Sequence, residues 1–315
     1  MGLFAGREGA RTDGSGARED LSACEPTHDV PSWHHEVMTE TRARYMDCSK
    51  SGNVAERMCE LLGMECNVLT DIVFSFSGLA TRGGGTGVHA DGWGLALYDG
   101  PVARVFLEPA AAAYSPLATF IRQHPIKTLL AIAHVRRKTR GQMTLANTHP
   151  FVRELWGRHF VFAHNGTVKR LERLKLGRFK PAGRTDSEYA FCALLAALQH
   201  DFKERPSRAQ LAQAVAAHSK RIGAEGTFNF LLGDGDQLYA RCSTKLHYIV
   251  RKAPFKKATL CDDDVCVDFA EVTTPDDRVA VVATMPLTRD ETWTAGEPNT
   301  MWVFRNGKLA KTLAS

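Results

Sequence analysis

The chain has 315 residues, of which 44% are hydrophobic, so it can bury a large core as one sizeable domain or two small ones. No stretch approaches the roughly 18 uninterrupted apolar residues that cross a bilayer, and the start lacks the apolar run of a secretory signal, so we expect a cytoplasmic protein without membrane contact. The net charge is +5; residues 1–58 hold seven Arg or Lys and ten Asp or Glu, a charge of −3, and residues 59–315 therefore carry +8. These cations are scattered without interleaved aromatic residues, which argues against nucleic-acid binding. A solvated basic surface or an anionic small substrate explains them.

Cysteine and histidine spacings give no sign of a disulfide framework or a metal site. The eight cysteines stand at irregular intervals in a long chain, which favours reduced thiols. Cys261 and Cys266 have three aspartates among the four residues between them, and without a second ligand pair an acidic loop is favoured over zinc. Four histidines are considered as metal ligands, and their spacing does not match that of a metal site: His89, His134, His149 and His164. The sequence therefore predicts neither a metal nor another cofactor.

Residues 1–57 differ in composition from the rest of the chain. They are rich in Gly, Ala, Arg, Glu and Ser and poor in branched apolar residues, so we expect a disordered extension. The stretch Trp33–Tyr45 has too few apolar positions to anchor a helix. From Cys59 onward, dense apolar segments alternate with turns, and no repeat or Pro/Gly/Ser linker interrupts them. Residues 58–315 are therefore predicted to form one domain.

A glycine-rich loop follows the first apolar segments, which are Glu60–Cys66 and Ile72–Phe76. The loop runs from Arg82 to Gly94 and leads into the strand-like stretch Leu95–Tyr98. Because it lacks the Lys-Ser/Thr ending of a phosphate-binding loop and no helical pattern follows, a nucleotide cradle is disfavoured. Tight backbone turns close to an active centre fit this composition better.

The later elements are strands, then helices, then strands again. Asp99-Gly100 and Asn306-Gly307 predict hairpin turns. Thr185 to Glu188 has the spacing of a helix capping box ahead of an apolar run, and a second helix is predicted over Arg208–Ile222. The predicted strands are Val102–Leu107, Thr128–Val135, Phe160–His164, Phe228–Leu232, Gln237–Arg241, His247–Val250, Val279–Ala283 and Met301–Phe304. This order is typical of an α+β fold.

Six short segments carry side chains suited to catalysis: Met58–Gly63, Asp91–Gly94, His134–Thr139, Asn147–Phe151, Ala163–Thr167 and Arg184–Glu188. In this order they closely resemble the class II glutamine amidotransferases, which are N-terminal-nucleophile (Ntn) hydrolases, and most closely the stand-alone YafJ-like branch. The resemblance covers residues 58–315 and does not extend to residues 1–57. It implies a four-layer αββα sandwich of the Ntn-hydrolase type.

Cys59 is the candidate nucleophile. Attack on an amide carbonyl needs a nucleophile and a base for its proton, and an α-amine titrates at about pH 8. If Cys59 is the first residue of the mature chain, its thiol and its own α-amine supply both. Translation from Met58 with loss of that methionine would expose Cys59, as would cleavage of a longer precursor; the composition of residues 1–57 favours a misassigned start. The competing interpretation is a buried cysteine that packs beside Leu61 and Leu62.

The other candidate site residues would surround the substrate that the resemblance implies. Asn165 and Gly166, which follow an apolar strand where the chain turns out of a sheet, would hold the oxyanion, although Asn-Gly is also a common turn. Arg136 would grip the substrate α-carboxylate. Asp186 would bind the α-ammonium, and an aspartate there also stabilises a helix N-terminus without any substrate. Arg82 matches, more loosely, an arginine near the nucleophile and is a further substrate-binding candidate.

Three functions fit these residues. The first is a glutaminase-type amidotransferase that hydrolyses the γ-amide of glutamine through a γ-glutamyl thioester on Cys59. The second keeps this chemistry and acts on a γ-glutamyl thiol peptide such as glutathione. The third is a catalytically silent binding protein, which follows if Cys59 never becomes the first residue. The implied partners are glutamine or another γ-glutamyl small molecule and an ammonia-accepting protein, and the resemblance is compatible with a homodimer. Arg137 stands where many relatives have an aromatic residue, so we expect a differently lined pocket.

Overall fold

The computed structural model of the chain describes residues 59–137 and 142–315. The predictions about residues 1–57, including the stretch Trp33–Tyr45, fall outside this range. Within the described ranges, no helix is long and apolar enough to cross a membrane.

Sheet A has seven strands in the order β13-β9-β12-β1-β4-β2-β3, and its paired strands are antiparallel. Its strands are β1 (Glu60–Thr70), β2 (Trp93–Asp99), β3 (Val102–Glu108), β4 (Thr128–Val135), β9 (His247–Lys252), β12 (Arg278–Ala283) and β13 (Thr294–Ala295). Because β1 pairs with both β4 and β12, it is a central strand. Residue 59 therefore lies at the end of a central strand.

Sheet B has six strands in the order β15-β14-β8-β7-β6-β5, also antiparallel. Its strands are β5 (Phe151–Leu155), β6 (Arg158–Val168), β7 (Gly226–Gly233), β8 (Leu238–Cys242), β14 (Thr300–Arg305) and β15 (Lys308–Ala314). A separate two-stranded hairpin is formed by β10 (Lys257–Thr259) and β11 (Cys266–Asp268).

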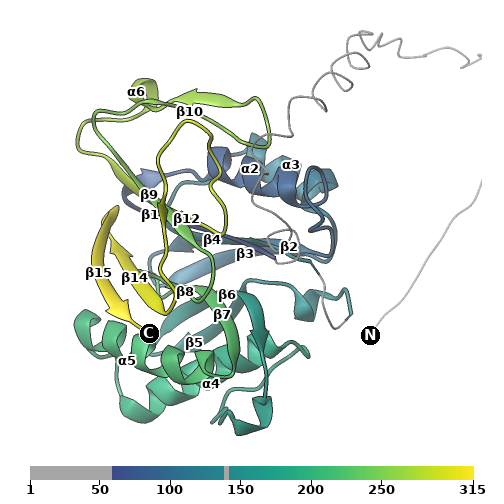
Figure 1. Cartoon of the computed structure of the whole chain (residues 1–315), viewed down its shortest axis with the longest axis vertical. Coiled ribbons are helices and arrows are strands. Elements are labelled where there is room, and N and C mark those ends of the chain that lie inside the picture. The colour runs from purple at the N-terminus through teal and green to yellow at the C-terminus, as the bar shows by residue number, and fades with distance from the viewer. Residues whose placement is uncertain (1–58, 138–141) are drawn as a thin grey trace, which may run out of the picture. The chain divides into compact units, whose positions relative to one another are not determined.

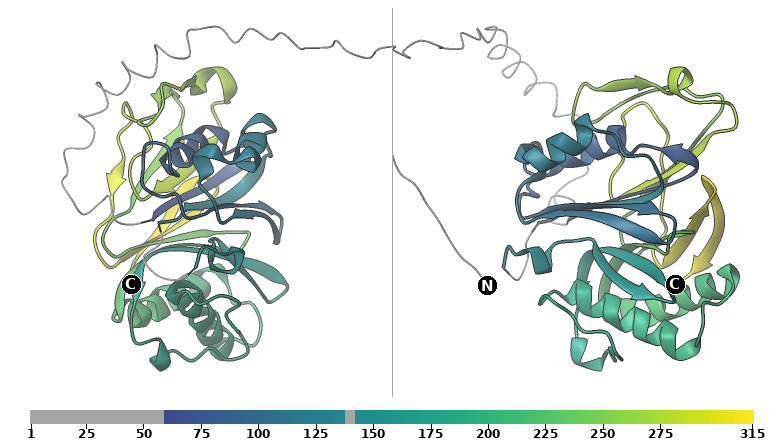
Figure 2. Two further views of the ribbon diagram at one scale, coloured as in Figure 1. Left: turned by 90° about the vertical axis from the view of Figure 1, so that its right-hand side faces the viewer. Right: turned by 180° about the vertical axis from the view of Figure 1, so that it is seen from behind.

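Helices cover the outer face of each sheet (Figure 1). Sheet A is covered by α2 (Val73–Arg82) and α3 (Pro116–Gln123). Sheet B is covered by α4 (Asp186–Asp201) and α5 (Arg208–Gly223). The short turns are η3 (Ala112–Tyr114), η4 (Leu145–Asn147), η5 (Leu171–Arg173) and α6 (Phe269–Val272). Figure 2 shows the same order of layers from two other sides. Helix, sheet, sheet and helix make up the predicted αββα sandwich.

Strand side chains alternate between the two faces of a sheet, and this divides the apolar core into three layers. On β1, Leu62 and Met64 pack with α2 and α3, whereas Leu61 packs in the layer between the sheets. The layer under α4 and α5 contains the stacked rings of Phe162 and Phe191, with centroids 4.9 Å apart. Both faces of each sheet are therefore covered, and functional side chains gather at the strand ends.

Several predicted elements are confirmed. The strands predicted over Thr128–Val135 and Phe160–His164 are β4 and the middle of β6, and the helix predicted over Arg208–Ile222 is α5. The apolar segment Ile72–Phe76, which was grouped with β-rich segments, instead lies almost entirely in the helix α2, which was not predicted. Neither α3 nor β5 was predicted, because each is short and its apolar pattern spans less than a few turns or pleats.

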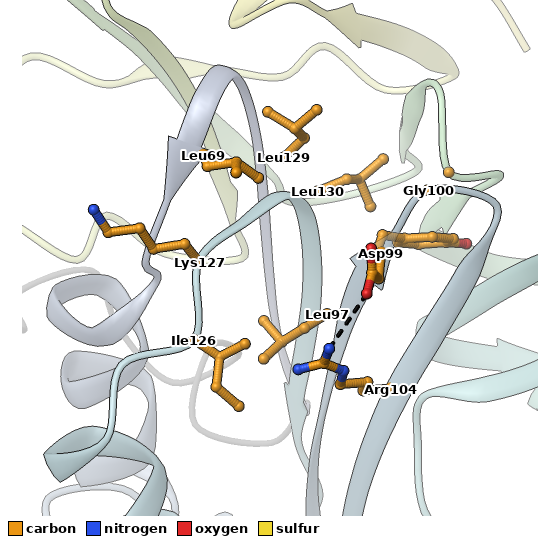
Figure 3. A pocket seen from close by; sticks show the side chains of 11 residues that line it. Leu69, Leu97, Asp99, Gly100, Arg104, Ile126, Lys127, Leu129 and Leu130 are labelled. Atoms are coloured by element: carbon orange, nitrogen blue, oxygen red, sulfur yellow. Dashed lines mark hydrogen bonds and ion pairs between the residues drawn. The ribbon is translucent and has the colours of Figure 1, made fainter.

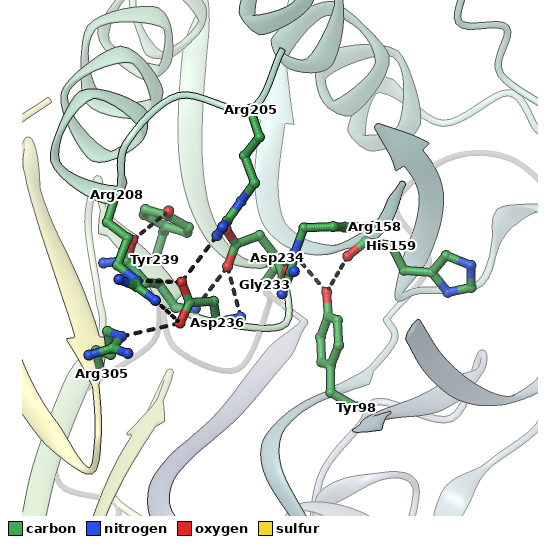
Figure 4. A network of polar contacts seen from close by, with 11 residues as sticks. Tyr98, Arg158, His159, Arg205, Arg208, Gly233, Asp234, Asp236, Tyr239 and Arg305 are labelled. Carbon is green, nitrogen blue, oxygen red and sulfur yellow. Dashed lines mark hydrogen bonds and ion pairs between the residues drawn. The ribbon is translucent and has the colours of Figure 1, made fainter. Parts of the chain in front are cut away.

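Arginines around the β7–β8 turn tie this turn to α5 and β14 (Figure 4). Asp236 accepts hydrogen bonds from Arg208 Nε at 2.5 Å and from Arg305 Nε at 3.2 Å. Arg205 bridges Asp236 and the buried Asp234, at 3.1 and 2.9 Å. Burial alone would raise the pKa of Asp236, but the bonds from the three arginines outweigh it and lower the pKa to about 2. The turn is therefore fixed by paired charges.

Candidate active site

Cys59 lies at the edge of sheet A where β1 begins. The β1–β4 register sets Glu60 opposite Val135, and it brings Cys59 beside Arg136 and Arg137. The Arg137 backbone N–H donates to Cys59 Sγ at 3.2 Å, and the thiol donates to the Arg137 carbonyl oxygen at 3.3 Å. The predicted nucleophile is therefore held by the backbone that follows β4.

The Cys59 thiol needs a base before it can attack. Burial raises its pKa to about 11, although the Arg137 backbone hydrogen bond and the Arg136 charge act to lower it. The thiol is then protonated near neutral pH. In the part of the chain that the structure describes, Sγ donates to a backbone carbonyl and to no side chain. The α-amine of the same residue stays the predicted base.

Asn165 and Gly166 lie inside β6, so the prediction that they occupy a turn out of the sheet is wrong. They pair with Asn229 and Phe228 of β7. Gly166 has φ +150°, and a Cβ at this position would lie 2.0 Å from the Thr227 carbonyl oxygen. Because glycine has no Cβ, β6 and β7 stay paired across this unusual backbone conformation. The pair is thereby placed within the sheet, facing the start of β1.

The Asn165 side-chain amide reaches from sheet B to Cys59. Its Nδ2 donates to the Cys59 carbonyl oxygen and lies 3.5 Å from Thr284 Oγ1. The same Thr284 oxygen accepts from the Leu61 backbone N–H at 2.9 Å, so it contacts the strand that follows Cys59. Asn165 Oδ1 is buried and has no hydrogen-bond partner in the described ranges. Buried polar groups are usually paired, so an acceptor without a partner is unusual inside the fold.

Arg136 is buried where β4 ends. Its backbone N–H donates to the Gly92 carbonyl oxygen at 2.7 Å, and its own carbonyl accepts from the Asp91 N–H at 3.0 Å. The end of the glycine-rich loop thus continues the hydrogen-bonded pairing of β2 with β4. Its Nη1 donates to the Gln142 carbonyl oxygen at 3.4 Å. A guanidinium presents its donors in a fork that matches a carboxylate, and this one lies beside Cys59.

Asp186 is the first residue of α4, directly after the N-cap Thr185. Its Oδ2 accepts from the Val168 backbone N–H at 2.7 Å, which ties the helix to β6 three residues beyond Asn165. Its Oδ1 takes no hydrogen bond from the described residues. The carboxylate therefore supports the helix N-terminus, and its contact with a substrate ammonium stays a prediction that this bond does not oppose.

Arg82, at the end of α2, is buried and joins Glu60 to the β10–β11 hairpin. Its Nη1 lies 2.8 Å from Glu60 Oε2, its Nε lies 2.5 Å from Asp262 Oδ2, and its Nη2 donates to the Pro286 carbonyl oxygen at 2.6 Å. Burial alone would lower the pKa of Arg82, but the Glu60 and Asp262 charges outweigh it and raise the pKa. Contact between Arg82 and substrate stays a prediction; its observed partner Glu60 is the neighbour of Cys59.

Buried histidines lie next to these residues. The His134 and His149 rings have centroids 4.3 Å apart. Burial first, and then neighbouring positive charge that includes Arg136, lowers the pKa of His134 to about 3 and that of His149 well below its usual range, so both are neutral. His164 Nδ1 lies 2.8 Å from Ser187 Oγ. Over residues 59–137 and 142–315, no three His, Cys, Asp or Glu side chains are grouped to hold a metal ion.

A cavity of about 200 Å³ lies at the opposite end of sheet A (Figure 3). Its lining includes Leu69, Leu97, Leu129 and Leu130, with Arg104 and Lys127. None of the predicted site residues lines it. Of these leucines, Leu69 and Leu129 are exposed, whereas Leu97 and Leu130 are buried. The chemistry around Cys59 is therefore separate from this cavity.

Comparison with known proteins agrees with this geometry. Residues 58–315 match the family described as class II glutamine amidotransferases. The chain belongs to this family. The putative glutamine amidotransferase YafJ of Escherichia coli (strain K12) is 48% identical over 252 residues, which cover 80% of this chain and 99% of that protein.

Two of the solved structures that resemble this chain illustrate the likeness. The 2.0 Å crystal structure of a predicted glutamine amidotransferase from Pseudomonas aeruginosa is 43% identical, with a TM-score of 0.66 over 80% of this chain and 100% of that one. The glutamine phosphoribosylpyrophosphate amidotransferase of B. subtilis is 16% identical, with a TM-score of 0.53 over 81% of this chain and 49% of that one, and it shares the fold alone. The predicted family and the αββα fold of the Ntn-hydrolase type are therefore confirmed, and the family implies an enzyme that handles amides.

Three residues near the site had no predicted role. Glu60 and Thr284 carry no local signal, because their partners are remote in the sequence. Asn147 stands in a segment that carries the family resemblance, and its two-sided amide could have drawn attention. Its contacts are described below.

Proposed function

We propose that the chain hydrolyses the γ-amide of glutamine and that Cys59, as the first residue of the mature protein, is the nucleophile. Its thiol attacks the amide carbon while its α-amine takes the thiol proton. The C–N bond then breaks, and the amine gives the proton to the departing nitrogen, which leaves as ammonia. Water, deprotonated by the same amine, hydrolyses the γ-glutamyl thioester to glutamate and restores the thiol.

The observation that carries this proposal is the environment of Cys59 Sγ. The thiol has a raised pKa, and its hydrogen bonds are to the Arg137 backbone. An α-amine that titrates at about pH 8 can accept the proton and return it. A Cys59 nitrogen within a peptide bond cannot. The mechanism therefore requires a chain that begins at Cys59, and we propose a start at Met58 followed by loss of that methionine.

Asn165 and Gly166 are proposed to stabilise the oxyanion. Asn165 Nδ2 already donates to the Cys59 carbonyl oxygen, so this amide lies at the residue where the tetrahedral carbon forms. Gly166 follows it on β6 and would add its backbone N–H. Loss of one such donor typically costs about 3 kcal/mol of transition-state stabilisation.

Arg136 and Asp186 are proposed to bind the α-carboxylate and the α-ammonium of the substrate. These groups form the α-amino-acid head group, remote from the amide that reacts. Arg82, which was predicted to bind substrate, is proposed instead to hold the start of β1 through its ion pair with Glu60. Ammonia released from glutamine would pass to an acceptor protein.

A glutamate-release assay and mass spectrometry of the mature N-terminus test the proposal together. The full chain, expressed in cells, should yield a protein that begins at Cys59 and releases glutamate from glutamine. The mature Cys59→Ala variant should lose at least about a thousandfold in kcat with its unfolding unchanged. Glutamate release by this variant at the wild-type rate would overturn the proposal. A chain that begins at Met1 or Gly2 and shows no turnover would instead support the silent binding protein.

A γ-glutamyl thiol peptide such as glutathione is the second candidate substrate. It follows from the proposed clamps, because Arg136 and Asp186 would bind only groups that glutamine and glutathione share. The ratio of kcat/KM for the two compounds decides between them. A large preference for glutathione would replace glutamine as the substrate, and no ammonia would then be released.

A further inference from the structure

The two proposed clamps stand on separate segments. Arg136 follows β4 in sheet A, whereas Asp186 begins α4 on the outer side of sheet B. An α-amino acid carries its carboxylate and its ammonium on one carbon, so the clamps must keep a fixed separation to grip both. Some contact in the fold has to set that separation.

Asn147 connects the two segments through its side-chain amide. Its Oδ1 accepts from the Arg184 backbone N–H at 2.9 Å, two residues before Asp186. Its Nδ2 donates at 3.1 Å to the Gln142 carbonyl oxygen, which also accepts from Arg136 Nη1 at 3.4 Å. A single amide therefore lies between the loop that leads to Asp186 and the carbonyl that Arg136 contacts.

The composition of the loop allows it to lie close to Asn147. A Cβ on Gly183 would lie 2.4 Å from Asn147 Oδ1 and 2.4 Å from the Ala146 carbonyl oxygen, so a larger residue would push the loop away. On its other side, Glu188 accepts from the Gly183 N–H at 2.7 Å, so its carboxylate does not complete the capping box predicted with Thr185. The loop is thus fixed to α4 and to Asn147 together.

The amide of Asn147 is matched to its place. The residue is 5% exposed, and both polar ends of its side chain are hydrogen-bonded. At this position the side chain must accept from a backbone N–H and donate to a backbone carbonyl. An amide can do both, whereas a carboxylate or an alkyl group cannot.

We propose that Asn147 is a positioning residue that sets the separation of the carboxylate clamp and the ammonium clamp. It thereby restricts the site to γ-glutamyl compounds with an intact α-amino-acid head group. This inference rests on the proposed function, because it takes Arg136 and Asp186 as the clamps. Asn147 acts through them, so its loss affects head-group recognition more than cleavage of the C–N bond.

Kinetics with a matched pair of substrates tests this inference in the mature enzyme produced from the full chain. Glutamine carries the whole head group, whereas glutaramate, the monoamide of glutaric acid, lacks the α-amine. The ratio of kcat/KM for glutamine over glutaramate reports the grip on the ammonium. Asn147→Ala should raise KM for glutamine about tenfold, keep kcat within about threefold, and lower this ratio about tenfold.

Thr148→Val is the matched control. Thr148 is buried in the same segment, and its hydroxyl donates to the Thr144 carbonyl oxygen at 2.9 Å, within that segment. Its loss should leave the substrate ratio unchanged. Gly183→Ala is the second test, because it displaces the loop while Asn147 stays intact, and it should also lower the ratio.

If circular dichroism shows that Asn147→Ala does not fold, the substrate ratio of Gly183→Ala decides whether the contact with Asn147 matters for head-group recognition. If the wild type is active and the folded variants keep its substrate ratio, the role of Asn147 is overturned while the proposed function stands. A wild type that hydrolyses neither glutamine nor glutathione would overturn the proposed function, and the inference would fall with it.

Discussion

Cys59 and Glu60 are neighbours in the chain, yet they contact opposite layers of the sandwich. Glu60 meets the helix layer, where its carboxylate pairs with Arg82 and Arg82 pairs in turn with Asp262. Cys59 meets sheet B, where its carbonyl oxygen accepts from the Asn165 amide. One residue step along a strand therefore separates a charge network from the candidate catalytic centre.

The two sides differ in how completely their polar groups are paired. On the helix side, all three nitrogens of the Arg82 guanidinium donate hydrogen bonds. On the side of sheet B, Asn165 Oδ1 and both ring nitrogens of His149 are buried without a partner in the described part of the chain. Fully paired charges hold a fold together, whereas unpaired buried groups are found where a ligand binds. This contrast supports a structural role for the Arg82 network and agrees with the proposal that substrate binds on the Asn165 side.

Arg82→Met should have the largest effect, and the effect should be on stability. It leaves Glu60 buried without its cation, which typically costs about 3–5 kcal/mol in the free energy of unfolding. Denaturant titration measures this loss. Arg289→Met is the matched control, because Arg289 and Asp264 form an exposed pair 3.4 Å apart, worth less than about 1 kcal/mol. Equal losses in the two variants would contradict a structural role for Arg82.

Asn165→Ala should act on catalysis instead. It removes an oxyanion donor, so kcat should fall by about a hundred- to a thousandfold. Because Asn165 Nδ2 donates to the Cys59 carbonyl oxygen, while Oδ1 has no partner among the described residues, the free energy of unfolding should fall by only about 1–3 kcal/mol, less than in Arg82→Met. Glutamate release and denaturant titration check the two parts. A large loss of stability with an unchanged kcat would reverse the roles assigned to the two sides.

His134→Leu should have the smallest effect, seen in the pH dependence of stability. The folded-state pKa of His134 is about 3, below the usual 6.5, so the folded state binds fewer protons than the unfolded chain between these values. The contribution of His134 to the free energy of unfolding is therefore constant above about pH 6.5. Below that pH it decreases by about 1.4 kcal/mol per pH unit for one histidine.

Denaturant titrations at two pH values within that window measure the slope. His134→Leu should reduce the wild-type slope by about one proton, or about 1.4 kcal/mol per pH unit. His200→Gln is the control, because His200 is exposed at the end of α4 and its loss should leave the slope unchanged. A slope that stays the same in His134→Leu would contradict a buried, neutral imidazole.

The sequence predicted elements well where the signal is local. The strand Thr128–Val135 and the helix Arg208–Ile222 follow from apolar alternation and from helix periodicity, and both are confirmed. The Asn165-Gly166 dipeptide has a strong local preference for a turn, but pairing with β7 keeps it in a strand. Tertiary contacts overrode the local preference there.

The candidate site residues could be named from motifs, but their surroundings could not. Cys59, Arg136 and Asn165 were predicted, and the structure brings them together at the start of β1. The pairing of Arg82 with Asp262 could not be foreseen, since the two residues are 180 positions apart. Charges on a sequence can pair in many ways, and packing selects one of them.

By itself, the sequence determined the chemical groups and the strands and helices that carry them, because periodicity, caps and turns act over a few residues. The tertiary structure alone decided three contacts: the Cys59 thiol is hydrogen-bonded to the Arg137 backbone, Glu60 pairs with Arg82, and Asn147 lies between the proposed clamps. Such contacts join residues as far apart as 223 positions, as between Leu61 and Thr284. The pairing of β1 with β4 and β12 and the packing of α2 on sheet A, which no local preference encodes, set the contacts of Cys59, Glu60 and Leu61.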